Sequence, residues 1–337
     1  MITKAKAVFK YFLKIKFPMK VAHYITYRCN LKCDMCGRRA IESEQEISTE
    51  QAIQLQKDFR KKGTIIWSFS GGECLVRKDI IDLSASVKNL GMDLIVVTNG
   101  ILLPKKQEIL EYADVINVSI DGNQESHEKL RGPNSYTKAL EALEIIKNSK
   151  KKRLKKVINA ILNNETINKE YLEHMLTVAK EYNCQLGFNP IIVHRSDLTD
   201  NIEKTYMPTY EQFRAFGKWL EEKKSSKDAV YFMDSPEFFK AIGQYPSKPN
   251  RIKCYAGMYQ CSIDPFGKTL PCSDFFDYEN SYEEKGLKWG CGTEGFDNLK
   301  VPNCPYPFCC TAKKNFFYDN PSLILKEYVL RKTPKNN

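Results

Sequence analysis

Three cysteines stand close together near the start of the sequence, at Cys29, Cys33 and Cys36. Cysteines grouped in this way bind soft metals, close disulfides or act as redox groups. Their C-x3-C-x2-C spacing differs from the common zinc and ferredoxin patterns. Three cysteines on one loop can hold three irons of a cubane cluster and leave the fourth iron open, as a catalytic centre requires. A zinc site would need a fourth ligand from elsewhere, such as His23.

The composition favours thiolate metal binding over disulfides. The chain has 337 residues and 12 cysteines, and no signal peptide is recognised, so we expect the thiols to be reduced. Only four histidines are present, and the metal ligands are therefore expected to be mainly cysteines. The sequence has no run of 18 or more apolar residues, which predicts a cytoplasmic protein without a transmembrane helix.

The elements that must position these cysteines follow an alternating pattern. Strands are predicted at 21–27, 64–70, 93–98, 115–120, 157–162 and 186–190, and helices at 49–61, 78–90, 104–112, 136–148 and 169–182, the first with Ser48 or Thr49 as its N-cap. This alternation predicts an α/β fold, a partial (β/α)6 TIM-like barrel with a small Cys-rich C-terminal extension. In such a barrel the strand carboxyl ends meet at one rim. The first strand leads into the cysteines, and the next three lead into SGGE (70–73), TNG (98–100) and SIDG (119–122).

The chain is divided into a basic amphipathic N-terminal helix (1–20), a core (21–225) and a cysteine-rich segment (250–320). The helix places Ile2, Ala5, Val8, Phe9, Phe12 and Leu13 on one predicted apolar face, with lysines off that face. Such a helix can lie on an anionic bilayer or pack on the domain. The net charge is +11, but the basic run 147–156 is interpreted as a solvated helix end and loop, and no specific nucleic-acid partner is expected.

Over roughly residues 21–190 the sequence resembles the radical S-adenosylmethionine (radical SAM) enzymes. Cys29, Cys33 and Cys36 match the cluster motif of that family. The residues that match its SAM-contacting positions are Met35 near the adenine, Gly71, Gly72 and Glu73 of the GGE motif at the amino group, Asn99 and Ser119 at the ribose and methionine part, and Arg131 near the carboxylate.

The resemblance implies two cofactors, a [4Fe–4S] cluster and SAM. The open iron would be chelated by SAM, and one electron would cleave the sulfonium bond to give a 5′-deoxyadenosyl radical. A low-potential electron donor such as ferredoxin or flavodoxin is the implied partner. Two glycines in the GGE motif are expected to let the backbone approach the ligand closely.

The C-terminal cysteines resemble the opening of SPASM and twitch extensions, which hold auxiliary [4Fe–4S] clusters. Cys254 and Cys272, with Gly267 between them, fit the start of that pattern, and IDPFGK (263–268) predicts a β-hairpin turn. The expected ligands of one auxiliary cluster are Cys254, Cys272, Cys304 and either Cys309 or Cys310, with Cys261 and Cys291 in reserve. A zinc knot is the alternative. Cys74 and Cys184 are expected to be small buried hydrophobic residues.

The substrate is left open between two classes. Peptide or protein modification is favoured by the SPASM-like tail, and modification of a lipid or isoprenoid at a membrane surface is suggested by the basic N-terminal helix. A non-catalytic SAM-binding scaffold is disfavoured by the intact cysteine triplet. His194 and Arg195 either face the substrate or belong to a solvated loop. Arg38 and Arg39 are either a basic rim or a solvated helix approach.

Overall fold

The computed structural model describes residues 2–36, 45–191, 205–233, 238, 254–272, 290–299, 318, 321–322 and 324. Several residues singled out by the sequence lie outside this set: Arg38, Arg39, His194, Arg195, Cys304, Cys309 and Cys310.

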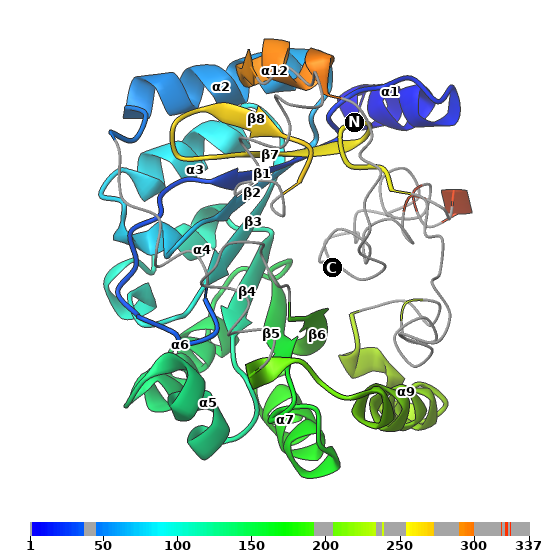
Figure 1. Ribbon diagram of the computed structural model, residues 1–337. Coiled ribbons are helices and arrows are strands. Elements are labelled where there is room, and N and C mark those ends of the chain that lie inside the picture. Colours follow the sequence, from blue (N-terminus) through cyan, green and yellow to red (C-terminus); the bar gives the residue numbers. More distant parts are fainter. Residues whose placement is uncertain are drawn as a thin grey trace.

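The described strands form one sheet in the order β6-β5-β4-β3-β2-β1-β7-β8-β9 (Figure 1). Their bounds are β1 Lys20–Tyr24, β2 Ile66–Ser70, β3 Asp93–Thr98, β4 Val115–Ser119, β5 Lys155–Leu162, β6 Gln185–Pro190, β7 Gln260–Ile263, β8 Lys268–Leu270 and β9 Gly290–Cys291. Strands β1 to β6 pair in parallel, and β7 pairs in parallel with the other edge of β1. Strands β8 and β9 continue the sheet in antiparallel fashion. The open, mostly parallel sheet confirms the predicted partial barrel.

Helices follow the parallel strands and cover the outer side of the curved sheet (Figure 1). They are α2 Thr49–Lys62, α3 Ile80–Asn89, α4 Ile109–Tyr112, α5 Gln124–Arg131, α6 Ser135–Lys147 and α7 Lys169–Glu181, followed by α9 Tyr210–Lys224 and α12 Gly292–Asn298. The predicted N-cap Ser48 is confirmed, because its side chain accepts the Gln51 N–H in a capping box. The predicted helix 104–112 is wrong: a 3₁₀ turn at Leu103–Lys105 ends at Lys106, where φ is −135°, and only α4 is helical.

The two faces of the sheet differ in chemistry. Ile116 and Val118 on β4 are buried in the main core together with Ala139 and Ala142 of α6. Because side chains alternate along a strand, Asn117 lies on the opposite, inner face. The helices thus cover an apolar face, and the inner face is free to carry polar groups.

The N-terminal helix α1 (Ile2–Phe12) packs on the domain with a face that only partly overlaps the predicted one. Ala7, Val8 and Tyr11 are buried in a second core cluster that includes Tyr255 and Tyr259. Of the predicted apolar face, Val8 is buried against the domain, whereas Ala5, Phe9, Phe12 and Leu13 are exposed, so packing on the domain does not account for the whole of that face. Tyr255 and Tyr259 lie more than 200 residues away from α1 in the sequence, and helical spacing alone does not reveal them as partners. In the described residues, no helix is long and apolar enough to cross a bilayer.

Candidate active site

The cysteine loop, residues 28–36, follows the carboxyl end of β1 and is held by its neighbours. The Asp34 N–H donates to the Leu130 carbonyl of α5 at 2.9 Å, and the Cys36 N–H donates to the Cys33 carbonyl at 3.1 Å. All three cysteines are free thiols. Burial raises the pKa of Cys33 to about 11, and the neighbouring charges of Cys36 and Cys29 add to this rise. The loop therefore carries three free thiols on one short segment that is hydrogen-bonded to α5.

Glu73 is a buried carboxylate that joins the second strand end to the third. One oxygen accepts the Thr98 hydroxyl at 2.9 Å and the Leu75 N–H at 3.0 Å, and the other accepts the Asn99 N–H at 2.7 Å. Burial raises the pKa of Glu73, and these hydrogen bonds act in the opposite direction. The carboxylate therefore fixes the TNG segment against the GGE segment.

The two glycines of that segment meet the chain itself. A Cβ on Gly71 would lie 2.2 Å from the Thr26 carbonyl oxygen, and a Cβ on Gly72 would lie 2.4 Å from the carbonyl oxygen of Arg28. The Gly72 N–H donates to Thr26 at 2.7 Å, and the Glu73 N–H donates to Arg28 at 3.0 Å. The glycines are thus required by the close approach of the backbone that leads into Cys29. This requirement exists in addition to the expected close approach of a ligand to the same segment.

Asn99 reaches from the third strand end to the cysteine loop. Its Nδ2 donates to Asn30 Oδ1 at 2.8 Å and lies 3.9 Å from the Cys29 sulfur. Ser119 stands half-buried at the end of β4 on the inner face. The structure therefore brings Asn99 to the cysteine loop, and it places Ser119 at the same strand rim.

Arg131 of α5 is close to the loop, and Met35 is the residue of the loop that packs on α5. The Arg131 guanidinium donates to Asp121 at 2.6 Å, and both side chains are buried. The other Asp121 oxygen accepts the Ile161 N–H at 2.7 Å. The positive charge of Arg131 opposes the rise in the pKa of Cys33. Met35 is buried against Leu130.

Asp121 is a site residue that the sequence reasoning missed. It is the acidic residue of SIDG, a segment in which the family resemblance points only to Ser119. The sequence feature that could have revealed Asp121 is an acidic residue just after the carboxyl end of a parallel strand, with a basic residue, Arg131, at the end of the short helix that follows. His127 supports the same turn, because its Nδ1 accepts the Asp121 N–H at 3.1 Å.

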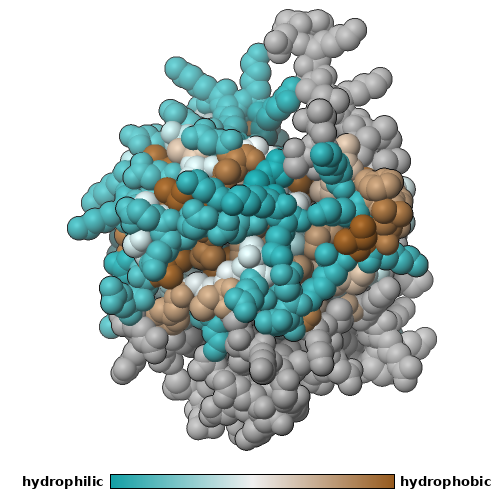
Figure 2. All heavy atoms as spheres, turned by 90° about the horizontal axis from the view of Figure 1, so that it is seen from above, coloured by the Kyte–Doolittle hydropathy of each residue, from teal (hydrophilic) through white to brown (hydrophobic). Residues whose placement is uncertain are grey.

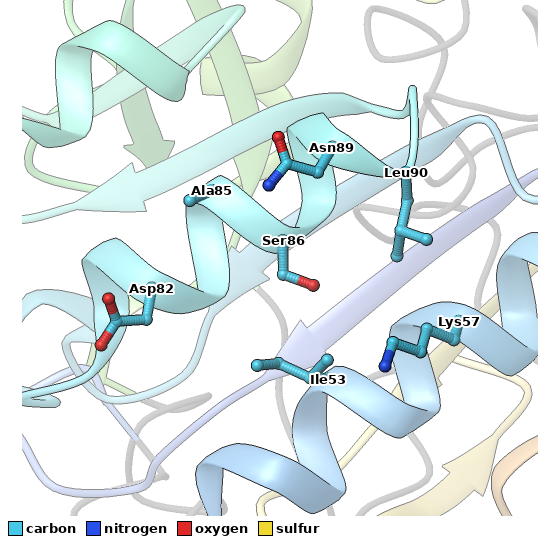
Figure 3. Close-up of a pocket in the computed structure, with 7 residues that line it drawn as sticks. All are labelled: Ile53, Lys57, Asp82, Ala85, Ser86, Asn89 and Leu90. Atoms are coloured by element: carbon cyan, nitrogen blue, oxygen red, sulfur yellow. The ribbon is translucent and has the colours of Figure 1, made fainter.

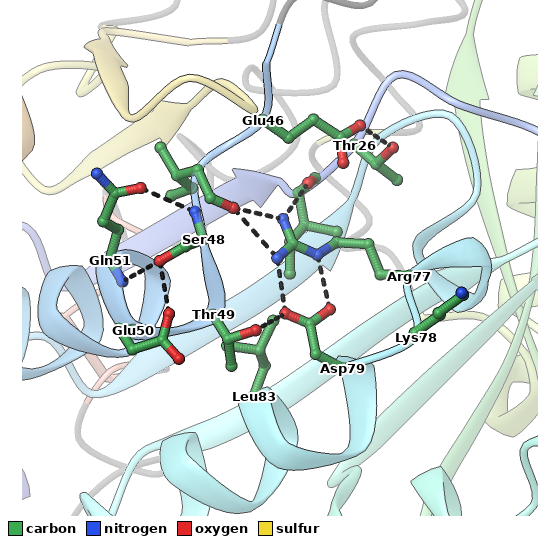
Figure 4. A network of polar contacts seen from close by, with 12 residues as sticks. Thr26, Glu46, Ser48, Thr49, Glu50, Gln51, Arg77, Lys78, Asp79 and Leu83 are labelled. Carbon is green, nitrogen blue, oxygen red and sulfur yellow. Dashed lines mark hydrogen bonds and ion pairs between the residues drawn. The ribbon is translucent and has the colours of Figure 1, made fainter.

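A second missed residue, Arg77, braces both sides of the cysteine loop (Figure 4). Its guanidinium donates to the Ile25 carbonyl before the loop, to the Ile47 carbonyl after it, and to both Asp79 oxygens. Glu46 adds a contact with Thr26 in the same region (Figure 4). The network ties the chain that enters the loop to the chain that follows it.

Comparisons with known proteins identify the family of the domain that carries this site. Residues 23–179 match the family described as the Radical SAM superfamily. The chain carries a radical SAM domain.

Relatives match beyond that domain. The AdoMet-dependent heme synthase of Methanosarcina barkeri is 28% identical over 281 residues, which are 76% of this chain and 76% of that protein. The PqqA peptide cyclase of Granulibacter bethesdensis is 27% identical over 279 residues, 77% of this chain and 68% of that protein. The crystal structure of Streptococcus suis SuiB bound to its precursor peptide SuiA has a TM-score of 0.64 at 17% identity, covering 99% of this chain and 71% of that chain, and it shows a shared fold.

The radical SAM domain has a donor set that fits its cofactor. In this superfamily a [4Fe–4S] cluster held by three cysteines supplies the electron that cleaves SAM. Cys29, Cys33 and Cys36 offer three free thiols on one braced loop, which suits three irons. Among the described residues, no group of three His, Cys, Asp or Glu side chains is gathered closely enough to hold a metal ion, so the three cysteines are assigned as ligands from their motif and not from their geometry. His23, the alternative zinc ligand, is buried with its ring 5.6 Å from that of Trp67, in an aromatic setting.

The candidate auxiliary ligands are only partly described. β7 and β8 form the predicted hairpin, with Cys254 ahead of it and Cys272 two residues after it. Cys304, Cys309 and Cys310 lie outside the described residues, so that ligand set stays a prediction. Of the reserve ligands, Cys261 is buried in the main core and burial raises its pKa strongly, whereas Cys291 is exposed at the start of α12. Cys74 and Cys184 are buried in the main core, as expected.

One pocket lies away from this site. It is a depression of about 390 Å³ between α2 and α3, on the outer side of the sheet (Figure 3). Ile53 and Lys57 line it from α2, and Asp82, Ala85, Ser86, Asn89 and Leu90 line the other side. None of its lining residues belongs to the site described above.

Proposed function

We propose that this radical SAM enzyme modifies a peptide or protein substrate, which it binds against the inner face of the barrel. The observation that carries this proposal is the chemistry of that face. Asn117 on β4, Asn159 on β5 and Asn189 on β6 are half-buried and alternate with residues of the helix-covered core. The Asn189 amide donates to the Asn159 oxygen at 2.7 Å.

Amide and hydroxyl groups suit a substrate that carries its own donors and acceptors. Ser68 and Ser70 on β2 extend the polar face, because their core-facing neighbours are Trp67 and Phe69. A peptide backbone can pair with such groups, whereas an isoprenoid chain would leave them buried without partners, which is costly. The inner face therefore supports a peptide over the lipid or isoprenoid alternative.

The relatives support the same class of substrate. The PqqA peptide cyclase, matched over 77% of this chain, acts on a peptide. The heme synthase is matched over a similar share of the chain, so an iron porphyrin is a necessary comparison in any substrate assay.

Within the site, we propose that the residues of this chain hold the cluster, bind SAM and fix the loops that surround both. Cys29, Cys33 and Cys36 would hold the cluster, and the Glu73 carboxylate holds the loop on which Asn99 stands. We further propose that Met35, Gly71, Gly72, Ser119 and Arg131 contribute to binding of SAM, as the family motifs imply. Cys254 and Cys272, with cysteines from 304–310, are proposed to hold one auxiliary cluster. Ferredoxin or flavodoxin is the proposed electron donor, in the cytoplasm.

The test combines iron content and SAM cleavage. Anaerobically reconstituted protein is expected to bind about eight irons per chain, from two cubane clusters. The Cys29→Ala/Cys33→Ala/Cys36→Ala variant is expected to retain about four and to form no 5′-deoxyadenosine. Cleavage of SAM by that variant would refute the assigned site. Substrate class is tested by offering the wild-type protein a library of short peptides and an iron porphyrin. Deuterium transfer into 5′-deoxyadenosine from labelled peptide supports the proposal, and transfer only from the porphyrin overturns it.

A further inference from the structure

Four large apolar side chains at the end of α1 remain exposed after the helix has packed on the domain. Phe9, Phe12, Leu13 and Ile15 are 64%, 48%, 55% and 44% exposed and are here named the apolar edge. In the described residues the only other exposed large hydrophobic side chain is Val230. Figure 2 shows hydrophobic side chains gathered on the side where α1 lies, bordered by hydrophilic ones. An isolated apolar cluster on a charged surface marks an interaction site.

The helix that carries the apolar edge is fixed in place. Lys4 pairs with Asp93 at 2.7 Å, and the Tyr11 hydroxyl donates to the Tyr318 carbonyl at 2.5 Å. Lys16 donates to the Leu299 carbonyl at 2.5 Å. These contacts hold the inner side of α1, so the outer side cannot turn inward.

The backbone at the end of α1 is also satisfied. The Leu13 N–H donates to the Phe9 carbonyl at 3.0 Å, and the Ile15 N–H donates to the Lys10 carbonyl at 3.0 Å. Lys14 takes a left-handed conformation, with φ 55°. A helix end closed in this way can lie against an apolar medium without exposing these amides to it.

We propose that the apolar edge, with Lys6 and Lys14, docks the protein on an anionic bilayer surface. Large apolar side chains that enter the lipid boundary, flanked by lysines that stay among the head groups, are the composition of an interfacial helix. Lys6 and Lys14 are exposed. The net charge of +11 favours an anionic surface and disfavours a second copy of this chain, which carries the same charge.

The docked orientation follows from the strand directions. Lys4 is paired with Asp93, the first residue of β3, and Lys10 donates to the carbonyl of Lys62, the last residue of α2. The apolar edge therefore lies at the amino-terminal ends of the parallel strands, and the cysteine loop follows a carboxyl end. Docking would hold the protein at the membrane with its active-site rim turned away from the lipid. This inference goes beyond the proposed function and does not require a lipid substrate.

The test uses the full chain and vesicle flotation. Vesicles of phosphatidylglycerol and phosphatidylcholine are expected to bind the wild-type protein, and vesicles of phosphatidylcholine alone are expected to bind it much more weakly. The Phe12→Ser/Leu13→Ser variant should lose at least tenfold in binding. The Lys6→Gln/Lys14→Gln variant should lose about thirtyfold and show a weaker dependence on salt. Val230→Ser is the matched control, because it removes an exposed apolar side chain elsewhere and should bind like the wild type.

All three variants alter exposed side chains, and their unfolding midpoints and 5′-deoxyadenosine formation in solution should match the wild type. Failure of the wild type to bind phosphatidylglycerol vesicles would overturn the proposal. So would equal binding by the wild type and the Phe12→Ser/Leu13→Ser variant. Sedimentation equilibrium supplies the remaining outcome: a dimer that this variant dissociates would identify the apolar edge as an interface between copies and overturn the proposed bilayer contact.

Discussion

Replacing Gly72 by alanine tests whether the active-site loop is positioned by the chain itself. A Cβ added at Gly72 would lie 2.4 Å from the Arg28 carbonyl oxygen and 2.5 Å from that of Tyr27, whereas ordinary contact begins at 3.4 Å. One of the two backbones must therefore move by about 1 Å. Gly72 does not have a left-handed φ, so the effect is purely steric. Overpacking of this kind costs about 1–3 kcal/mol of stability.

The functional effect of Gly72→Ala should be larger than the stability effect. The displaced backbone leads directly into Cys29, and a 1 Å misplacement of reacting groups lowers a rate about a hundredfold. The assay measures 5′-deoxyadenosine formation with a chemical reductant, iron content and urea unfolding of the cluster-free chain. Gly91→Ala is the control for activity, since the nearest atom to its Cβ is the Arg60 side chain at 3.6 Å and it precedes β3 at the opposite end of the strands. Gly91 has a φ of 70°, so this variant should lose about 1–2 kcal/mol of stability through backbone strain while it keeps the wild-type rate of 5′-deoxyadenosine formation. A Gly72→Ala protein that cleaves SAM at the wild-type rate would refute the reasoning.

Two further predictions concern stability. Arg77→Met should destabilise the fold by about 3–5 kcal/mol, because Asp79 and two backbone carbonyls lose a buried partner. Arg77→Lys should restore little of this stability, because lysine lacks the planar fork of donors. An Arg77→Met protein that unfolds in urea with the wild-type free energy would contradict this role. Burial lowers the pKa of His127 to about 4, below its ordinary 6.5, so the unfolded chain binds the proton more tightly. Stability should therefore be fully present above about pH 6.5 and fall by about 3 kcal/mol as the pH drops to about 4. His127→Asn, which keeps an acceptor for the Asp121 N–H, should flatten this pH dependence in urea unfolding, and an unchanged slope would exclude His127 as its source.

The parallel strands and their helices were predictable because their signals are local. β3 is observed at the predicted residues 93–98, and α2 begins after the predicted cap Ser48 and ends before Gly63, whose φ is 116°. The rim residues followed from the same reasoning, since the carboxyl ends of parallel strands must meet. Glu73 and Asn99, which are 26 residues apart, are hydrogen-bonded in the structure as this argument requires.

The remaining features depend on contacts between distant parts of the chain. The buried side of α1 is set by tyrosines such as Tyr259, and the sequence offers apolar residues on both sides of that helix. Strand β7 was recognised only as part of a hairpin, because its parallel pairing with β1 joins residues about 240 positions apart. Arg77 looked like any basic residue in a loop, because its acceptors Ile25 and Ile47 are backbone carbonyls without a sequence signature.

The hydrogen bonds at the rim bear on when the cluster is acquired. Gly72 binds Thr26, Glu73 binds Arg28 and Asp34 binds Leu130, all through backbone groups that involve no metal ligand. Since these bonds form within the polypeptide, they can order the loop before iron is present. The conformational entropy lost in ordering the loop is then offset by the folding of the domain and not by the binding of iron. Structural zinc fingers behave differently, because their chains remain unfolded without metal. The cluster-free chain should therefore unfold cooperatively in urea. The variant without Cys29, Cys33 and Cys36 should have the same free energy of unfolding as the cluster-free wild-type chain. A loop that became protected from proteolysis only after iron was added would show that the cluster, and not the chain, orders the site.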